Sequence, residues 1–80
     1  MTIEVFFYAQ LKDYFGDKLM LEVSDEATAV EIRNKLSEKN ALAADWLKVS
    51  RLASDDAFLS EDFAVAAGGR YYLLPPSSGG

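Results

Sequence analysis

Apolar residues follow two different spacings in the first part of this chain, and each change of spacing marks a new expected element. Residues 3–8 alternate with large apolar or aromatic groups on both faces, which is typical of a central β-strand. Residues 9–15 carry apolar groups at helical spacing, and Gly16 follows where a helix cap is expected. Residues 19–23 alternate again and predict a second strand.

The main helix is expected to begin at Thr28 and to end at Asn40. Thr28 and Glu31 match a capping box, in which a hydroxyl and a carboxylate bond to the first free amides of a helix. The residues predicted to face the core are Ala29, Ile32 and Leu36. Those predicted to point mostly outward are Arg33, Lys35 and Glu38.

The second half of the chain predicts shorter elements. Residues 41–49 are compatible with a helical turn or an irregular loop, whose apolar stripe on the core would be Leu42, Trp46 and Val49. Residues 51–54 predict a short strand, and residues 57–59 predict its return. Residues 70–74 predict the last strand, which Pro75 ends because proline has no N–H for a sheet ladder.

This order of elements predicts an α+β fold with one main helix packed on a mixed sheet. The first two strands, the helix and a last strand that returns to the middle of the sheet form the β-grasp arrangement. We therefore expect one domain over residues 1–74 and an extended C-terminal tail over residues 75–80.

The composition excludes several kinds of chemistry. The 80 residues include no cysteine and no histidine, so the usual side-chain nucleophile, general base and metal ligand are missing, and no metal site is expected. The formal net charge of −5 disfavours nucleic acid and anionic membranes and favours a basic protein partner. The acidic pairs fall at predicted turns, where solvated charges are expected: Asp25-Glu26, Asp55-Asp56 and Glu61-Asp62.

The last six residues cannot join the domain, and they leave two alternatives open. Pro75 and Pro76 stop the strand, and Ser77, Ser78, Gly79 and Gly80 then run to a sterically bare carboxyl group. One alternative is a frayed end or a cloning scar. The other is a thin arm that fits closely against a second protein.

Two segments resemble a known family. Residues 5–16 are similar to the opening of the small, sulfur-carrying subunit of molybdopterin synthase, and residues 72–80 are similar to its apolar strand, double proline, two variable residues and terminal di-glycine. The resemblance spans the whole chain, and the terminal pattern is its most specific part.

The resemblance implies a function for the α-carboxylate of Gly80. In that family an E1-like enzyme uses ATP to adenylate this carboxylate, and sulfur from a donor system then replaces AMP to give a thiocarboxylate. The tail enters the large synthase subunit and supplies sulfur to cyclic pyranopterin monophosphate. The chain itself is expected to bind no cofactor, to lack independent catalysis, and to form a heterotetramer with the large subunit.

The resemblance also implies roles for other residues. The tail residues expected to line a partner's channel are Pro75, Pro76, Ser77, Ser78 and Gly79. Residues expected to flank the docking surface are Phe7, Lys12 and Leu74. For Phe7 and Leu74 the competing interpretation is a place in the core.

Three other functions remain open at this point. A thiamine-pathway sulfur carrier and a ubiquitin-like protein modifier share the fold and the terminal di-glycine, and a plain interaction module would have an inert tail. The first residues lack the basic region and long apolar run of a signal peptide, and no segment approaches the roughly 20 apolar residues of a membrane span. We therefore expect a cytoplasmic protein without a membrane partner.

Overall fold

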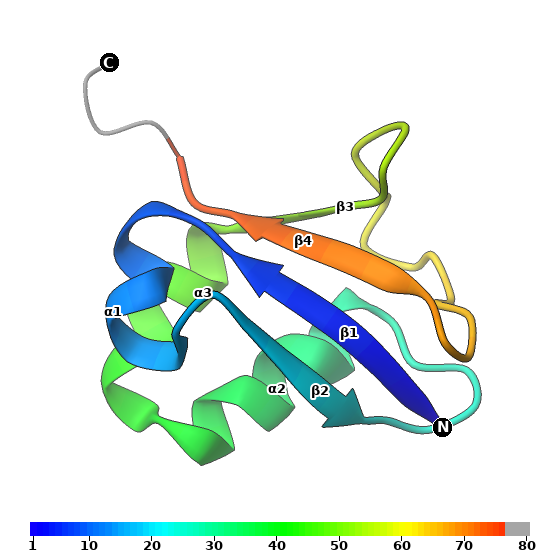
Figure 1. Cartoon of the computed structure of the whole chain (residues 1–80), viewed down its shortest axis with the longest axis horizontal. Coiled ribbons are helices and arrows are strands. Elements are labelled where there is room, and N and C mark those ends of the chain that lie inside the picture. The colour runs from blue at the N-terminus through cyan, green and yellow to red at the C-terminus, as the bar shows by residue number, and fades with distance from the viewer. Residues whose placement is uncertain (77–80) are drawn as a thin grey trace.

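The computed structural model describes residues 1–76, and residues 77–80 lie outside the described part. Its elements follow the predicted order (Figure 1): β1 (Thr2–Phe7), a 3-10 turn η1 (Ala9–Leu11), α1 (Lys12–Phe15), β2 (Lys18–Glu22), α2 (Ala29–Lys39), a 3-10 turn η2 (Ala41–Ala43), α3 (Ala44–Val49), β3 (Arg51–Ala53) and β4 (Arg70–Leu74). Within the described residues, no helix is long and apolar enough to span a membrane.

The four strands form one mixed sheet in the order β2-β1-β4-β3. β1 pairs with β4 in parallel, while the β1–β2 and β3–β4 pairs are antiparallel. In Figure 1 the helices gather on one side of this sheet, and β4 runs beside β1 in the middle. The predicted β-grasp fold, with its last strand in the centre of the sheet, is confirmed.

The alternation along β1 divides its residues between the core and the opposite face. Ile3, Val5 and Phe7 are at most 1% exposed and pack under the helices. Glu4 and Phe6 point to the other face and are only half-buried. Because β1 has a hydrogen-bonded neighbour on each side, the prediction of a central strand is confirmed.

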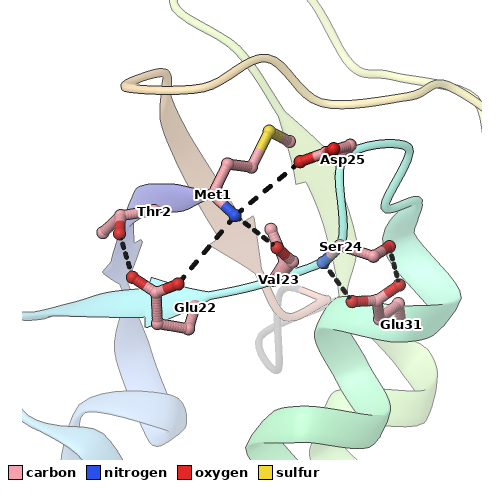
Figure 2. Close-up of polar contacts among 7 residues, drawn as sticks. All are labelled: Met1, Thr2, Glu22, Val23, Ser24, Asp25 and Glu31. Atoms are coloured by element: carbon pink, nitrogen blue, oxygen red, sulfur yellow. Dashed lines mark hydrogen bonds and ion pairs between the residues drawn. The ribbon is translucent and has the colours of Figure 1, made fainter.

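The main helix has the predicted core face, but its predicted capping box is wrong. Thr28 occupies the N-cap position of α2 without any side-chain cap hydrogen bond. The Glu31 carboxylate instead accepts hydrogen bonds from the backbone N–H and the hydroxyl of Ser24 (Figure 2). Ser24 thus offers two donors, and the Glu31 carboxylate bonds to this loop residue and not to the backbone N–H of Thr28. Asn40 ends α2 as predicted.

Residues 41–49 are helical, and of the predicted stripe only Trp46 packs against the core. Leu42 is 82% and Val49 52% exposed, while Ala43 and Leu47 are the buried residues. The Asn40 side chain accepts a hydrogen bond from the N–H of Leu42 and fixes a 3-10 turn before α3 begins. Because a 3-10 turn has only about three residues, it shifts the phase of the following helix.

Arg33 does not point into solvent as predicted. Its guanidinium group donates to the backbone oxygens of Leu47 and Ser50 and pairs with the Glu61 carboxylate. Only 15% of its side chain is exposed. Arg33 therefore ties α2 to the end of α3 and to the loop before β4.

The loop from residue 54 to residue 69 is more irregular than predicted. The expected return strand is reduced to one bridge between Ala53 and Phe58. Val65 is 3% exposed, and its N–H donates to the backbone oxygen of Ala27, which fastens the loop to the core. Gly68 turns the chain into β4 with a φ of 72°, a conformation that favours glycine.

Candidate docking face and exit of the C-terminal segment

The C-terminal segment leaves the domain from the middle of the sheet. Leu73 is fully buried and pairs with Phe7 of β1 on one side and Leu52 of β3 on the other. Pro75 follows β4 at once and is half-buried, whereas Pro76 is exposed. Since proline donates no ladder hydrogen bond, the chain leaves the sheet at this point. The base of the tail is therefore held by two neighbouring strands.

The tail leaves at the end of the sheet where all four strands have one of their ends. β1 and β4 end there because they are parallel, and β2 and β3 begin there because each is antiparallel to its neighbour. In the register of the sheet, Lys18 lies opposite Phe6, and Arg51 lies opposite Leu74. Two cationic side chains thus mark this end of the outer strands.

The face of the sheet opposite the core carries a cluster of aromatic rings. The ring centroids of Phe6 and Tyr72 lie 5.3 Å apart in a stacked arrangement. Tyr8 lies beside them, 6.2 Å from the Tyr72 ring and 42% exposed. We call Phe6, Tyr8 and Tyr72 the aromatic face. Stacked aromatic side chains with exposed edges are enriched at protein interfaces.

Charged side chains border the aromatic face on the side of Phe6. The Glu4 carboxylate lies 3.0 Å from Lys18 Nζ and 3.4 Å from Arg70 Nε. Both cations also lie 5.8 Å from the centroid of the Phe6 ring. This arrangement of an apolar centre and a charged border is that of a protein-docking surface.

A hydrogen bond connects the aromatic face to the loop after β3. The hydroxyl of Tyr72 donates to the carboxylate of Asp55. This hydrogen bond is the main cause that raises the pKa of Tyr72, because the carboxylate favours the protonated phenol. The neutral Tyr72 hydroxyl therefore fixes the acidic loop next to the exit of the tail.

The structure separates the three residues expected to flank the docking surface. Phe7 is 1% exposed and stacks on Phe15 in the interior at 4.8 Å, so it has the competing role, that of a core residue. Lys12 is half exposed, and its Nζ lies 3.7 Å from Asp17. Leu74, the last residue of β4, is half-buried where the tail leaves the sheet. The interface roles of Lys12 and Leu74 remain predictions.

The predicted reactive and channel-lining residues of the tail fall mostly outside the described part of the chain. Ser77, Ser78, Gly79 and Gly80 belong to residues 77–80, so their roles remain predictions. Pro75 and Pro76 are described and show the direction of the exit only. Across residues 1–76, no group of three or more acidic side chains could hold a metal ion.

Sequence reasoning gave Phe6, Tyr8 and Tyr72 core or protein-interface roles but did not select them as site residues. The signal was present, because Phe6 and Tyr72 occupy the outward positions of two strands that were both expected to be central. On a two-layer fold an outward aromatic on a central strand lacks a helix to cover it. This combination, more than the buried Phe7, indicates a docking surface.

Comparison with known proteins gives matches to structures only. The sequence matches no known family model, and no curated protein gives a significant sequence match. Solved structures, in contrast, match over nearly the full length of this chain.

Three of these structures are informative. SAMP1 from Haloferax volcanii has a TM-score of 0.78 at 22% identity, with 100% of both chains covered. A putative molybdopterin converting factor subunit 1 from Pyrococcus furiosus has a TM-score of 0.81 at 14% identity, covering 96% of this chain and 99% of that one. A complex of subunits 1 and 2 of molybdopterin-converting factor from Helicobacter pylori gives 0.70 at 26% identity, with 100% of both chains covered.

Proposed function

Because this chain is a small ubiquitin-like protein of the β-grasp fold, similar to molybdopterin converting factor subunit 1 and to SAMP1, we propose that it is a sulfur carrier. In this proposal the sulfur that it carries is used in the synthesis of molybdopterin. Its reactive group is the α-carboxylate of Gly80, which requires Gly80 to be the last residue of the mature protein.

The proposed reaction begins with activation by a second protein. A terminal carboxylate has an ordinary pKa of about 3.3–3.7, so at neutral pH it is ionised and a poor electrophile. An E1-like enzyme transfers AMP from ATP to this carboxylate and releases pyrophosphate. A sulfide-level sulfur nucleophile from a donor system then attacks the acyl carbon, AMP leaves, and a thiocarboxylate remains on Gly80. No side chain of this protein takes part in these bond changes.

The observation that carries the proposal is the way in which the tail is held. Leu73 is fixed between β1 and β3, and the chain leaves the sheet at Pro75 beside the aromatic face. Six residues from Pro75 onward reach about 20 Å when extended. A partner that docks on the aromatic face therefore receives the tail in a defined direction and at a defined reach.

The comparisons support one partner of this kind. The Helicobacter pylori structure is a complex of subunits 1 and 2, and its similarity to this chain supports a large-subunit partner. In the proposal this large subunit binds cyclic pyranopterin monophosphate and accepts the sulfur, and the two subunits form a heterotetramer. ATP is bound by the activating enzyme and not by this chain, and the reactions take place in the cytoplasm.

The proposal is tested by a variant with one alanine appended after Gly80. The extra residue moves the carboxylate and puts a Cβ where the sequence has none, so sulfur transfer to the large subunit should be lost. Glu38→Ala, an exposed change on α2, serves as the matched control and should transfer sulfur normally. Equal unfolding midpoints in urea would show that both variants fold. Transfer by the extended variant would contradict the proposal.

A ubiquitin-like modifier is the second candidate, because SAMP1 is a small archaeal modifier protein and matches this chain over its full length. Both functions begin with activation of the same carboxylate. They differ in the product, because a modifier would form an isopeptide bond with a lysine of another protein. Peptides that carry a Gly-Gly remnant on lysine would identify the modifier, and a free thiocarboxylate would identify the carrier.

A further inference from the structure

A shallow pocket lies directly beside the exit of the C-terminal segment. Its volume is about 310 Å³, and we call it the exit pocket; its lining residues are Ala53, Ser54, Asp55, Asp56, Ala57, Phe58 and Leu74. Ligand sites span roughly 300–1,000 Å³, so this pocket has room for one long side chain and not for a large cofactor. Leu74 lines it and is also the last residue before Pro75.

Hydrogen bonds hold the wall of the exit pocket in shape. The N–H of Ser54 donates to the backbone oxygen of Ala57 at 2.9 Å, and the N–H of Asp56 donates to Ser54 Oγ at 3.3 Å. Tyr72 fixes Asp55 through its hydroxyl. A pocket whose loop is already ordered binds a partner with a smaller entropic cost.

The pocket combines an apolar interior with an acidic border. Phe58 is 52% exposed, and its ring is held by the Arg51 guanidinium, 3.9 Å from the ring centroid. Asp55 and Asp56 are exposed on the border. Within residues 1–76, no cationic nitrogen lies within 4.0 Å of either carboxylate. Neither carboxylate therefore forms a close ion pair in the described part of the chain, although the Arg51 guanidinium lies on the neighbouring Phe58 ring.

We propose that the exit pocket receives an arginine side chain of the protein that takes up the tail. The aliphatic part of an arginine packs on Leu74 and Phe58, while its planar guanidinium group reaches the two carboxylates. Arginine fits better than lysine because its fork can bridge two acidic groups. The formal net charge of −5 also favours a basic partner.

This inference rests on the proposed function only for the identity of the partner. The Asp55-Asp56 pair, which the sequence indicated only as solvated turn charges, becomes a recognition element that fixes the partner at the base of the tail. An arginine in the pocket lies next to Leu74 and therefore sets where residues 75–80 enter the partner.

The test uses the full chain, NMR chemical shifts and a pair of capped tripeptides, acetyl-Gly-Arg-Gly-amide and acetyl-Gly-citrulline-Gly-amide. Citrulline has nearly the shape of arginine but no charge. The arginine peptide should shift the amide signals of residues 53–58 and 74, with an affinity at least tenfold above that of the citrulline peptide. Equal binding of the two peptides, or shifts confined to other residues, would overturn the inference.

A double variant, D55N/D56N, tests the same point from the other side. Asparagine keeps an oxygen that can accept from Tyr72, so the fold should persist, and D56N alone is a milder alternative. Both variants should weaken binding of the arginine peptide, the double variant at least tenfold. Unchanged binding by a folded D55N/D56N protein would contradict the inference. The titration needs no sulfur, so it tests arginine binding in the exit pocket even if Gly80 never carries sulfur.

Discussion

Phe7 and Leu73 face each other across the parallel pair of β1 and β4, and both are buried in the core. This pairing joins the first strand of the chain to the last one. It places the start of the C-terminal segment at the end of β1, where the chain turns into η1. The position of the tail is therefore a consequence of core packing.

The first prediction compares Leu73 with its neighbour Leu74. Leu73→Ala removes a fully buried side chain and should lower the free energy of unfolding by about 2–5 kcal/mol. Leu74→Ala, at a half-buried position, should cost about 1 kcal/mol or less but should weaken binding to the arginine peptide. Urea unfolding and the peptide titration measure the two effects. Equal losses of stability would contradict the assignment of Leu73 to the core and Leu74 to the exit.

The second prediction concerns Arg33. Arg33→Met keeps most of the packing but leaves the backbone oxygens of Leu47 and Ser50 without their donor, so the free energy of unfolding should fall by about 1–3 kcal/mol. Lys39→Met, at an exposed position of the same helix, should change it by about 0.5 kcal/mol at most. Urea unfolding of both variants checks the prediction. An Arg33→Met variant with an unchanged free energy of unfolding would show that the hydrogen bonds from Arg33 to the end of α3 contribute no stability.

The third prediction is a pH dependence from Glu31. The two hydrogen bonds from Ser24 lower the pKa of the Glu31 carboxyl below its ordinary value of 4.5. A lowered pKa in the folded state means that stabilisation is present above the ordinary pKa and is lost as the pH falls through the folded value. Glu31→Gln should therefore be less stable than the parent protein at neutral pH and should lose less stability on acidification.

The control for this pH dependence is Glu38→Gln, an exposed change on the same helix. Urea unfolding at a series of pH values between neutral and strongly acidic should give parallel curves for Glu38→Gln and the parent protein. A Glu31→Gln curve that also runs parallel to the parent would contradict the role of the Ser24–Glu31 contact shown in Figure 2.

The fourth prediction tests the aromatic face as a docking surface. Tyr72→Ala should weaken binding to the large subunit at least tenfold, because central aromatic residues dominate protein interfaces. Val30→Ala, an apolar residue that is 54% exposed on α2, should bind normally. Isothermal titration calorimetry with the purified large subunit distinguishes the two. Loss of binding in Val30→Ala with normal binding in Tyr72→Ala would place the interface on the helical side instead.

The four strands of the sheet were predictable because alternation and turn residues act locally, whereas the predicted return strand at residues 57–59 is only a single bridge. Residues 70–74 coincide with β4, and the large groups on both faces of β1 correctly predicted a central strand. These signals depend on neighbours along the chain and on the need to bury apolar area. Contacts between residues that lie far apart in the sequence are not predicted by such local patterns.

The errors arose where a distant or non-helical contact decided the outcome. Glu31 bonds to Ser24, seven residues earlier, and so does not complete the capping box with Thr28. The 3-10 turn at Ala41–Ala43 changed the helical phase and turned Leu42 outward. Arg33 donates to backbone oxygens at the end of α3, a contact that the helical periodicity of the sequence does not indicate.

The sequence suggested a chemistry for the candidate site, which remains a prediction, but it did not indicate the docking surface. The absence of cysteine and histidine and the terminal di-glycine directed attention to Gly80. The docking surface lies on the side of the sheet that the helices leave uncovered. The pairing of β1 with β4 and the placement of α2 together determine which side that is. The sequence left Phe7 open between the docking surface and the core, and the structure places it in the core, with Phe6 and Tyr72 on the opposite face.

The measurement that tests the central claim most directly is the intact mass of the protein purified from its own cells, followed by fragmentation of its C-terminal peptide. The account predicts a fraction of molecules in which one oxygen is replaced by sulfur, with the added mass on Gly80. An unmodified carboxylate on every molecule, under conditions in which the activating enzyme and the sulfur donor are present, would contradict it.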